Sequence, residues 1–326
     1  MDTQSDSLFP DLTVYRFLLA LQLGPGRESL PLYLGSTFRG VFASSFRRIV
    51  CVTGAPECHG CLLIHRCAYP YIFETPPPPD SPEVLQKRFR QAPRPYVLQV
   101  PGTYDAGTEL ELGLVVIGKA IDFLPYFIYV LQEMGKQGLG RTRVPYRLLT
   151  VRDGSTENGP VVFQADRQVL SESFRPIRLA ALKREGDKQV TDLTLEFLTP
   201  LRIKKYGGYG QAEEQLDFSQ LVDLLLGRIE ALAFFHCGEP WGHDEQVREE
   251  ARKVQVVSRN LSFYSLERYS NRQQQKLPLH GYVGTITVEG PLGTFLPLLR
   301  LGEYLHLGAG TAFGLGQYRL HVSGRE

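Results

Sequence analysis

The order of expected strands and helices repeats once along this chain, and the repeat constrains the fold more than any other feature. Alternating apolar residues mark the strands, and apolar residues at helical spacing mark the helices. The first half gives strand, helix, strand, strand, helix, strand over residues 12–23, 36–49, 96–100, 110–117, 122–134 and 146–151. The second half gives the same order over residues 192–198, 219–232, 254–263, 282–288, 292–301 and 317–322.

A glycine-rich segment precedes the last strand of each half, at 138–141 in the first and 308–316 in the second. Two matches at the same place indicate a duplicated β-α-β-β-α-β unit, the ferredoxin-like order. We therefore expect an α+β fold of two tandem ferredoxin-like, RRM-like modules. The expected domains are 1–155 and 156–326, with a cysteine-rich insert at about 51–95 in the first.

The length and the charge narrow the class of protein. A chain of 326 residues is long for one core and suits two domains. It carries 36 Lys and Arg against 35 Asp and Glu, so a nucleic-acid site has to come from local clusters. No apolar run reaches the roughly 20 residues of a membrane span, and the polar start MDTQSDS is unlike a secretory signal. We expect a cytoplasmic protein without a membrane partner.

Several basic clusters lie near aromatic residues, a pattern that favours RNA binding. For any single cluster, an ordinary solvated surface explains the pattern as well. The basic residues that we select as RNA-binding candidates are Arg39, Arg141, Arg143, Arg202, Lys204 and Lys205.

The second glycine-rich segment is a candidate phosphate site. Glycine permits positive φ and close backbone approach, and successive N–H groups in such a loop can hold a phosphate. The segment lacks the Gly-Lys-Ser/Thr ending of a P-loop and the strand-turn-helix context of a dinucleotide fingerprint. The four glycines concerned are Gly308, Gly310, Gly314 and Gly316. A tight structural turn is the alternative.

Four of the five cysteines form a cluster with C-x6-C-x2-C-x5-C spacing, namely Cys51, Cys58, Cys61 and Cys67. Four thiolates suit tetrahedral zinc, and the C-x2-C pair supplies two of them from one tight turn. Disulfides are disfavoured in a reducing cytoplasm. We expect structural zinc, with an iron–sulfur cluster or four thiols without metal as alternatives.

Several motifs resemble the CRISPR-associated endoribonucleases of the RAMP superfamily, which cut precursor CRISPR RNA within its repeats. The most specific is the C-terminal run that combines 279–284, 295–299, 302–308 and 311–316. Residues 267–273 and 199–204, Phe38-Arg39-Gly40 and the cysteine cluster with the following 71–76 also fit this family. The resemblance spans most of the chain.

The resemblance implies RNA cleavage without a metal cofactor. The ribose 2′-OH attacks the adjacent phosphate and leaves a 2′,3′-cyclic phosphate and a 5′-OH. This chemistry needs a base, an acid, and donors for the phosphorane oxygens. The implied partners are CRISPR repeat RNA, the mature crRNA and other CRISPR effector subunits.

His306 is the first candidate for acid–base catalysis, because it lies two residues before the glycine-rich loop and matches the family-like motif. A partly buried histidine bonded to backbone is the alternative. Tyr269 and Arg268 are further catalytic candidates, and Arg272 is an RNA-binding candidate. Many family members have a catalytic histidine in or near the first helix, but this chain has none there.

Three functions follow from these motifs. The leading one is a repeat-specific endoribonuclease that retains or delivers the mature crRNA. The second is a non-catalytic RAMP subunit that binds crRNA in an effector complex, which the missing first-helix histidine favours. The third is a scaffold that uses its metal site and arginine-rich faces to contact proteins.

Overall fold

A computed structural model describes residues 10–101, 109–205, 208–209, 216–241, 245–270 and 275–322. It combines helices with two main antiparallel sheets, and the chain divides into two compact units. The N-terminal unit comprises 14–177 together with 312–314, and the C-terminal unit contains the rest. The N-terminal unit therefore continues past the expected boundary at residue 155. Within the part described, no helix combines the length and apolar character needed to cross a membrane.

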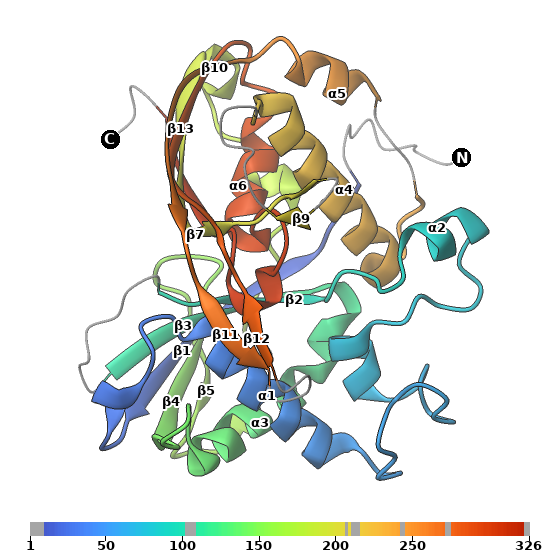
Figure 1. Ribbon diagram of the computed structural model, residues 1–326, viewed down its shortest axis with the longest axis vertical. Coiled ribbons are helices and arrows are strands. Elements are labelled where there is room, and N and C mark those ends of the chain that lie inside the picture. The colour runs from blue at the N-terminus through green and yellow to red at the C-terminus, as the bar shows by residue number, and fades with distance from the viewer. Residues whose placement is uncertain are drawn as a thin grey trace. The chain divides into compact units, whose positions relative to one another are not determined.

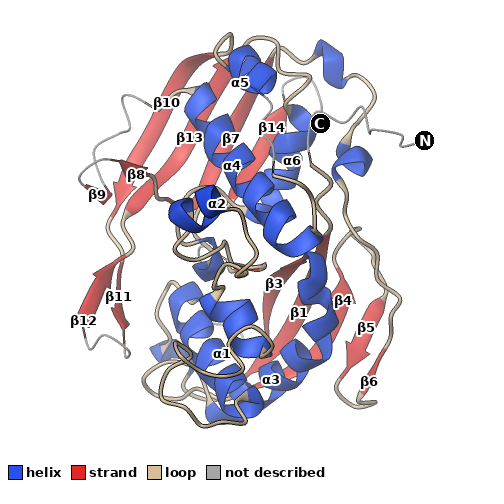
Figure 2. Cartoon of the chain, turned by 90° about the vertical axis from the view of Figure 1, so that its right-hand side faces the viewer, coloured by secondary structure: helices blue, strands red, loops and turns tan. Residues whose placement is uncertain are grey.

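The sheet of the N-terminal unit has the order β2-β3-β1-β4-β5-β6. Its strands, labelled in Figures 1 and 2, are β1 (Val14–Leu23), β2 (Tyr96–Gln99), β3 (Glu109–Ile117), β4 (Tyr146–Asp153), β5 (Val161–Gln164) and β6 (Val169–Leu170). Its helices are α1 (Gly35–Val50), α2 (Glu83–Arg88) and α3 (Leu124–Gln137), with a π-helical turn η2 (Pro70–Glu74) and the 3-10 turns η1 (Arg27–Ser29) and η3 (Gly118–Phe123).

The alternating pattern of β1 explains how this unit forms its core. Phe17, Leu19 and Leu21 point to one face and are buried, while the residues between them are at least partly exposed. The buried face packs in one cluster with Phe38 and Phe42 of α1 and with aromatic and aliphatic residues of α3. The helices therefore cover one face of the sheet because they share its apolar core.

The sheet of the C-terminal unit has the order β10-β13-β7-β14. Its strands are β7 (Asp192–Leu201), β10 (Gln255–Tyr264), β13 (Gly281–Glu289) and β14 (Tyr318–Val322). Helices α4 (Phe218–Cys237) and α6 (Leu296–Leu305) lie on one face of it (Figure 2). The smaller elements are β8 (Lys204–Lys205), β9 (Gly208–Tyr209), α5 (Glu245–Ala251), the hairpin β11 (Glu267–Ser270) and β12 (Gln275–Pro278), and the turns η4 (Leu179–Leu182) and η5 (Asp187–Gln189). The turn η7 (Thr311–Phe313) begins in this unit and ends in residues that belong to the N-terminal unit.

The two main sheets share one arrangement of their strands. In the N-terminal sheet, the first strand β1 lies between β3 and β4. In the C-terminal sheet, the first strand β7 lies between β13 and β14 in the same way. The N-terminal sheet is extended by β5 and β6, which the sequence pattern did not predict. The expected helix at 292–301 is observed as α6, four residues later at each end.

Candidate functional site

Arg202, directly after β7, joins three segments of the C-terminal unit. Its buried side chain donates from Nε to the backbone oxygen of His280 over 3.0 Å. Its own backbone oxygen accepts from the N–H of Ala309 over 2.8 Å, and Arg202 pairs with Gly308 in an isolated parallel bridge. One arginine thus holds the residue before β13 and the glycine-rich loop together.

The glycine-rich loop is held in place by its own backbone. Gly308 and Gly316 have positive φ, and a Cβ would lie 2.4 Å from the Arg202 oxygen at the first and 1.7 Å from the Leu307 oxygen at the second. The N–H of Gly316 donates to the oxygen of Pro200 over 3.0 Å. Gly310 and Gly314 also have positive φ. These positions require glycine, and the N–H groups of Ala309 and Gly316 bind protein carbonyls rather than point outward.

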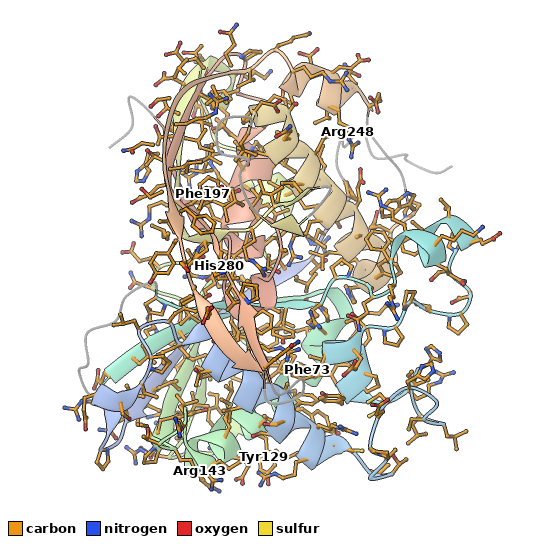
Figure 3. All side chains as sticks on the ribbon, in the orientation of Figure 1. Phe73, Tyr129, Arg143, Phe197, Arg248 and His280 are labelled. Atoms are coloured by element: carbon orange, nitrogen blue, oxygen red, sulfur yellow. The ribbon has the colours of Figure 1, made fainter. Side chains whose placement is uncertain are left out.

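His280, labelled in Figure 3, lies between β12 and β13 and is joined to this loop through Arg202. Its Nδ1 accepts from the backbone N–H of Leu266 over 3.2 Å, and the hydroxyl of Ser265 lies 3.3 Å from the same nitrogen. An accepting Nδ1 places the proton of the neutral ring on Nε2. The half-buried imidazole is therefore oriented as a donor through Nε2.

Exposed aromatic side chains lie next to His280. The Phe263 ring, at the end of β10, is 5.7 Å from the His280 ring and 5.5 Å from the Tyr282 ring, centroid to centroid. Phe263 is 52% exposed and Tyr264 is 43% exposed. Exposed aromatic rings are typical of surfaces that stack bases of single-stranded nucleic acid.

His306, the first catalytic candidate, is enclosed in the C-terminal unit. It follows α6 with φ of 60° and is fully buried. Burial, with a smaller contribution from the positive charge of Arg228, lowers the pKa of His306 to about 3. Within the described residues neither ring nitrogen makes a hydrogen bond of standard geometry, although a backbone group of Leu315 favours protonation. A neutral ring closed off from solvent is poorly suited to proton transfer with RNA.

The basic candidates of the N-terminal unit occupy two different environments. The Arg39 guanidinium on α1 lies 5.8 Å from the Phe73 ring centroid and 5.1 Å from that of Phe313. Arg141 and Arg143 are exposed in the turn between α3 and β4, where Leu139 and Val144 exchange two backbone hydrogen bonds. The first glycine-rich segment is thus a packed turn that presents two exposed arginines, of which Arg143 is labelled in Figure 3.

The remaining basic and aromatic candidates cannot be placed in the site. Arg272 lies outside the described residues, and only the backbone is described at Arg268, Tyr269, Lys204 and Lys205. The backbones of Arg268 and Tyr269 belong to β11, which pairs with β12 next to His280.

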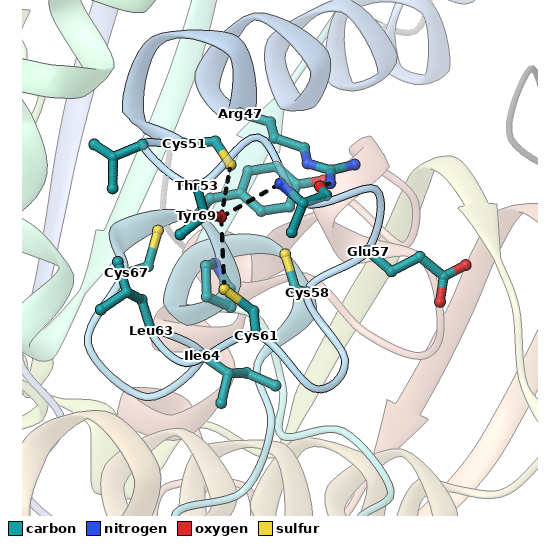
Figure 4. Close-up of a pocket in the computed structure, with 13 residues that line it drawn as sticks. Arg47, Cys51, Thr53, Glu57, Cys58, Cys61, Leu63, Ile64, Cys67 and Tyr69 are labelled. Atoms are coloured by element: carbon teal, nitrogen blue, oxygen red, sulfur yellow. Dashed lines mark hydrogen bonds between the residues drawn. The ribbon is translucent and has the colours of Figure 1, made fainter.

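The four clustered cysteines line one pocket of the N-terminal unit (Figure 4). All of them are free thiols. Thr53 Oγ1 lies 3.7 Å from the sulfur of Cys51 and 3.7 Å from that of Cys61. Among the residues that the structure describes, no three or more His, Cys, Asp and Glu side chains already stand at metal-coordinating separation.

Each half of the chain matches a protein-family model. Residues 12–174 match the family model AF_1859_N, described as an N-terminal domain. Residues 195–318 match the model of the CRISPR-associated endoribonuclease Cas6, and this range includes Arg202, His280 and the glycine-rich loop. The chain belongs to the Cas6-type CRISPR RNA-processing family.

Solved Cas6 structures share the fold of this Cas6-type chain. The product complex of the Thermus thermophilus Cas6 protein TTHB231 aligns with a TM-score of 0.53 at 19% identity, over 94% of this chain and all of that one. A chain of a Cas6-RT-Cas1–Cas2 complex aligns with a TM-score of 0.56 at 16% identity, over 98% of this chain and 47% of the longer one. A protein of Archaeoglobus fulgidus described as uncharacterized is 28% identical over 298 residues, which are 89% of this chain and 92% of the relative.

The sequence patterns did not single out His280, although it lies inside the most specific motif of this Cas6-type chain. The available signal was its position at the start of β13, two residues from an aromatic residue and next to a glycine. The hydrogen bond from Arg202 joins residues 78 apart in the chain, a separation that local patterns do not reveal.

Proposed function

We propose that this protein is an endoribonuclease that cleaves precursor CRISPR RNA within its repeats by attack of the ribose 2′-OH on the adjacent phosphate. The reaction forms the bond from O2′ to phosphorus, breaks the bond to O5′, and leaves a 2′,3′-cyclic phosphate and a 5′-OH. The observation that carries the proposal is the junction at Arg202, which fixes His280 and the glycine-rich loop within the part that matches the Cas6 model. No metal takes part in this proposed step.

His280 is proposed to act as a hydrogen-bond donor to the phosphate. Because Nδ1 accepts from Leu266, the neutral ring can donate from Nε2 to an oxygen that gains charge in the transition state. The guanidinium of Arg202 adds a positive charge next to this residue. Such preoriented donors stabilise a phosphorane without any reorganisation at the moment of reaction.

The exposed rings of Phe263 and Tyr264 are proposed to stack repeat nucleotides beside the cut site. The exposed Arg141 and Arg143 are proposed to contact the RNA backbone elsewhere along the repeat. Both units are proposed to be ferredoxin-like modules of the RAMP type, which the shared strand arrangement supports. The mature crRNA stays bound or passes to other CRISPR proteins.

One observation favours the non-catalytic RNA-binding subunit as a second function. The first helix carries Ala43, Ser44 and Ser45 rather than a histidine, and Gln137 Nε2 donates to the Ser45 hydroxyl over 3.1 Å. This part of α1 is therefore occupied by a structural contact. A subunit of this kind would bind the repeat with the same surface and leave it intact.

The test incubates the purified chain with its own repeat RNA in EDTA and follows cutting and binding separately. We expect cutting in EDTA, with 3′ product ends that need removal of a cyclic phosphate before 3′ labelling or ligation and with 5′-OH ends that a kinase can phosphorylate directly. In His280→Ala, which removes the donor, cutting falls by on the order of 10²–10³-fold while binding is retained, which is the usual effect of losing one transition-state donor. The control His321→Gln alters an exposed histidine of the same unit and keeps the wild-type rate.

Two results would change the assignment. Binding of the repeat without cutting selects the non-catalytic subunit, and neither binding nor cutting selects a protein scaffold. Cutting at the wild-type rate in His280→Ala removes His280 from the mechanism. A parallel His306→Ala variant shows whether the buried histidine contributes in spite of its enclosure.

A further inference from the structure

The segment 51–67 of the N-terminal unit has a defined backbone conformation but no hydrophobic core of its own. None of its residues is buried, and its apolar side chains Leu62 and Val52 are 93% and 83% exposed. Apolar burial therefore contributes little to holding these residues in one conformation. Short segments that lack a core are ordinarily held by a disulfide or a metal, and the cysteines here are free thiols.

The four thiol groups of this segment point toward one centre. Cys51, Cys58, Cys61 and Cys67 line the same pocket, and their sulfur atoms surround the Thr53 hydroxyl (Figure 4). The sulfurs of Cys51 and Cys61 each lie 3.7 Å from that hydroxyl. Among the described side chains no three or more ligands already stand at metal-coordinating separation, so binding of an ion by all four thiols would require the sulfurs to move inward.

The backbone at the central cysteine pair forms a tight turn. The N–H of Cys61 donates to the oxygen of Cys58 over 3.0 Å, and Gly60 between them has φ of 77°. A turn of this kind lets two thiolates two residues apart bind the same ion. The N–H of Cys67 donates to the oxygen of Leu63 over 2.8 Å, which places the fourth thiol one turn further along.

Arg47 of α1 anchors the segment and supplies positive charge at the pocket. Its Nη2 donates to the oxygen of Pro56 over 2.7 Å and also to that of Ala55, and the guanidinium lies 5.7 Å from the centroid of the Tyr69 ring. Four thiolates around a divalent ion leave a net charge of about −2, which an adjacent arginine offsets. The pocket lining thus combines the ligands with a countercharge.

We infer that Cys51, Cys58, Cys61 and Cys67 bind one Zn²⁺ as a tetrahedral tetrathiolate that fastens the segment 51–67 to helix α1. Binding releases the four thiol protons to solvent and forms four Zn–S bonds of about 2.3 Å, with no change of oxidation state. Four protein ligands leave no position open for water, so the ion is structural and independent of the proposed RNA cleavage.

The experiment measures metal content by mass spectrometry in the full chain, purified without chelator. We expect about one zinc per chain in the wild type and in Cys237→Ser, whose thiol lies at the end of α4 in the other unit. The double variant Cys58→Ser/Cys61→Ser is expected to hold less than roughly a fifth of that, because two of four ligands are lost. Replacement of zinc by Co²⁺ is expected to give the strong visible absorption of tetrahedral cobalt bound by thiolates.

A second measurement keeps the inference testable if the double variant folds poorly. In wild-type chain, removal of zinc is expected to speed trypsin cleavage after the exposed Arg66 by on the order of tenfold or more, and re-addition of Zn²⁺ is expected to reverse it. Folded wild-type protein without stoichiometric metal overturns the inference, as does zinc retained by the double variant. Iron found together with acid-labile sulfide also overturns the inference, because it would show that the four cysteines bind an iron–sulfur cluster.

Discussion

The Nε of Arg202 donates a hydrogen bond to the backbone oxygen of His280 over 3.0 Å, and through its own backbone oxygen Arg202 also accepts from Ala309. Arg202 is therefore a positioning residue. It holds the backbone of His280 and the glycine-rich loop in one arrangement, although His280 and Ala309 follow Arg202 by 78 and 107 residues in the sequence.

Loss of the Arg202 side chain is expected to lower cutting more than binding. In Arg202→Ala we expect repeat cleavage to fall by on the order of 10²-fold, because small displacements of catalytic groups cost about this much. Repeat affinity changes less, as measured by titration of a non-cleavable 2′-deoxy repeat. The control Arg252→Ala removes an exposed positive charge of the same unit and is expected to leave the cleavage rate unchanged. Equal losses of rate and affinity would make Arg202 a simple RNA contact.

A methyl group at Gly308 is expected to separate the glycine-rich loop from Arg202. The Cβ of Gly308→Ala would lie 2.4 Å from the Arg202 oxygen at a backbone φ of 79°. We expect a loss of stability of about 1–3 kcal/mol together with reduced cleavage, measured by denaturant titration and by RNA assay. Gly40→Ala is the matched control, since a Cβ there meets no atom within 4 Å in α1, and it is expected to be neutral or slightly stabilising. An unchanged Gly308→Ala protein would contradict the close approach.

Much of the fold follows from local patterns. The strands β1, β2, β3 and β4 and the helices α1 and α3 lie close to the expected ranges, because apolar alternation and helical spacing report directly on which face is buried. The short strands β5 and β6 were not predicted, since four and two residues carry too little pattern. The inclusion of 312–314 in the N-terminal unit could not be predicted either, because it depends on contacts such as that of Tyr33 with Phe313 across 280 residues.

The candidate site was only partly accessible from the sequence. The motifs marked stretches that hydrogen bonds of Arg202 join in the structure, but they did not distinguish His306 from His280. The distinction is one of burial. His306 is enclosed beside Arg228, whose Nε donates to the oxygen of Leu305 over 3.1 Å, whereas His280 is half-buried directly before β13. Local sequence patterns do not show how deeply each of these two histidines is buried.

The buried His306 is expected to make stability depend on pH. Its pKa of about 3 in the folded chain lies below the ordinary value of 6.5 that it regains on unfolding. As the pH falls from 6.5 toward 3, the unfolded chain takes up a proton at His306 that the folded chain does not. The contribution of the neutral His306 to the free energy of unfolding is therefore fully present above pH 6.5 and is lost as the pH falls. Between pH 7 and pH 4.5, the free energy of unfolding of the wild type is expected to fall by roughly 2–3 kcal/mol more than that of His306→Leu. This follows from about 1.4 kcal/mol for each pH unit below 6.5.

The measurement is the difference in free energy of unfolding between wild type and His306→Leu, taken by denaturant titration from pH 7 to pH 4. The difference cancels the contributions of other titrating groups, such as Glu303, whose pKa is raised by burial. A constant difference between wild type and His306→Leu would show that His306 is accessible to protons in the folded state.

The pair Asp187–Arg300 is expected to be the ionic contact on which the C-terminal unit depends most. Arg300 of α6 donates from Nη1 and Nη2 to the two carboxylate oxygens of Asp187, each over 2.7 Å, and both side chains are buried. Asp187 also accepts from the N–H of Arg184, and Arg300 donates to the oxygen of Leu182. Asp187→Ala leaves a buried guanidinium without its counterion, so we expect a loss of about 3–5 kcal/mol. In Glu250→Ala, which breaks an exposed pair with Lys253, we expect less than about 1 kcal/mol. Denaturant titration of both variants decides, and similar small losses in the two would mean that water or another group replaces the carboxylate at Arg300.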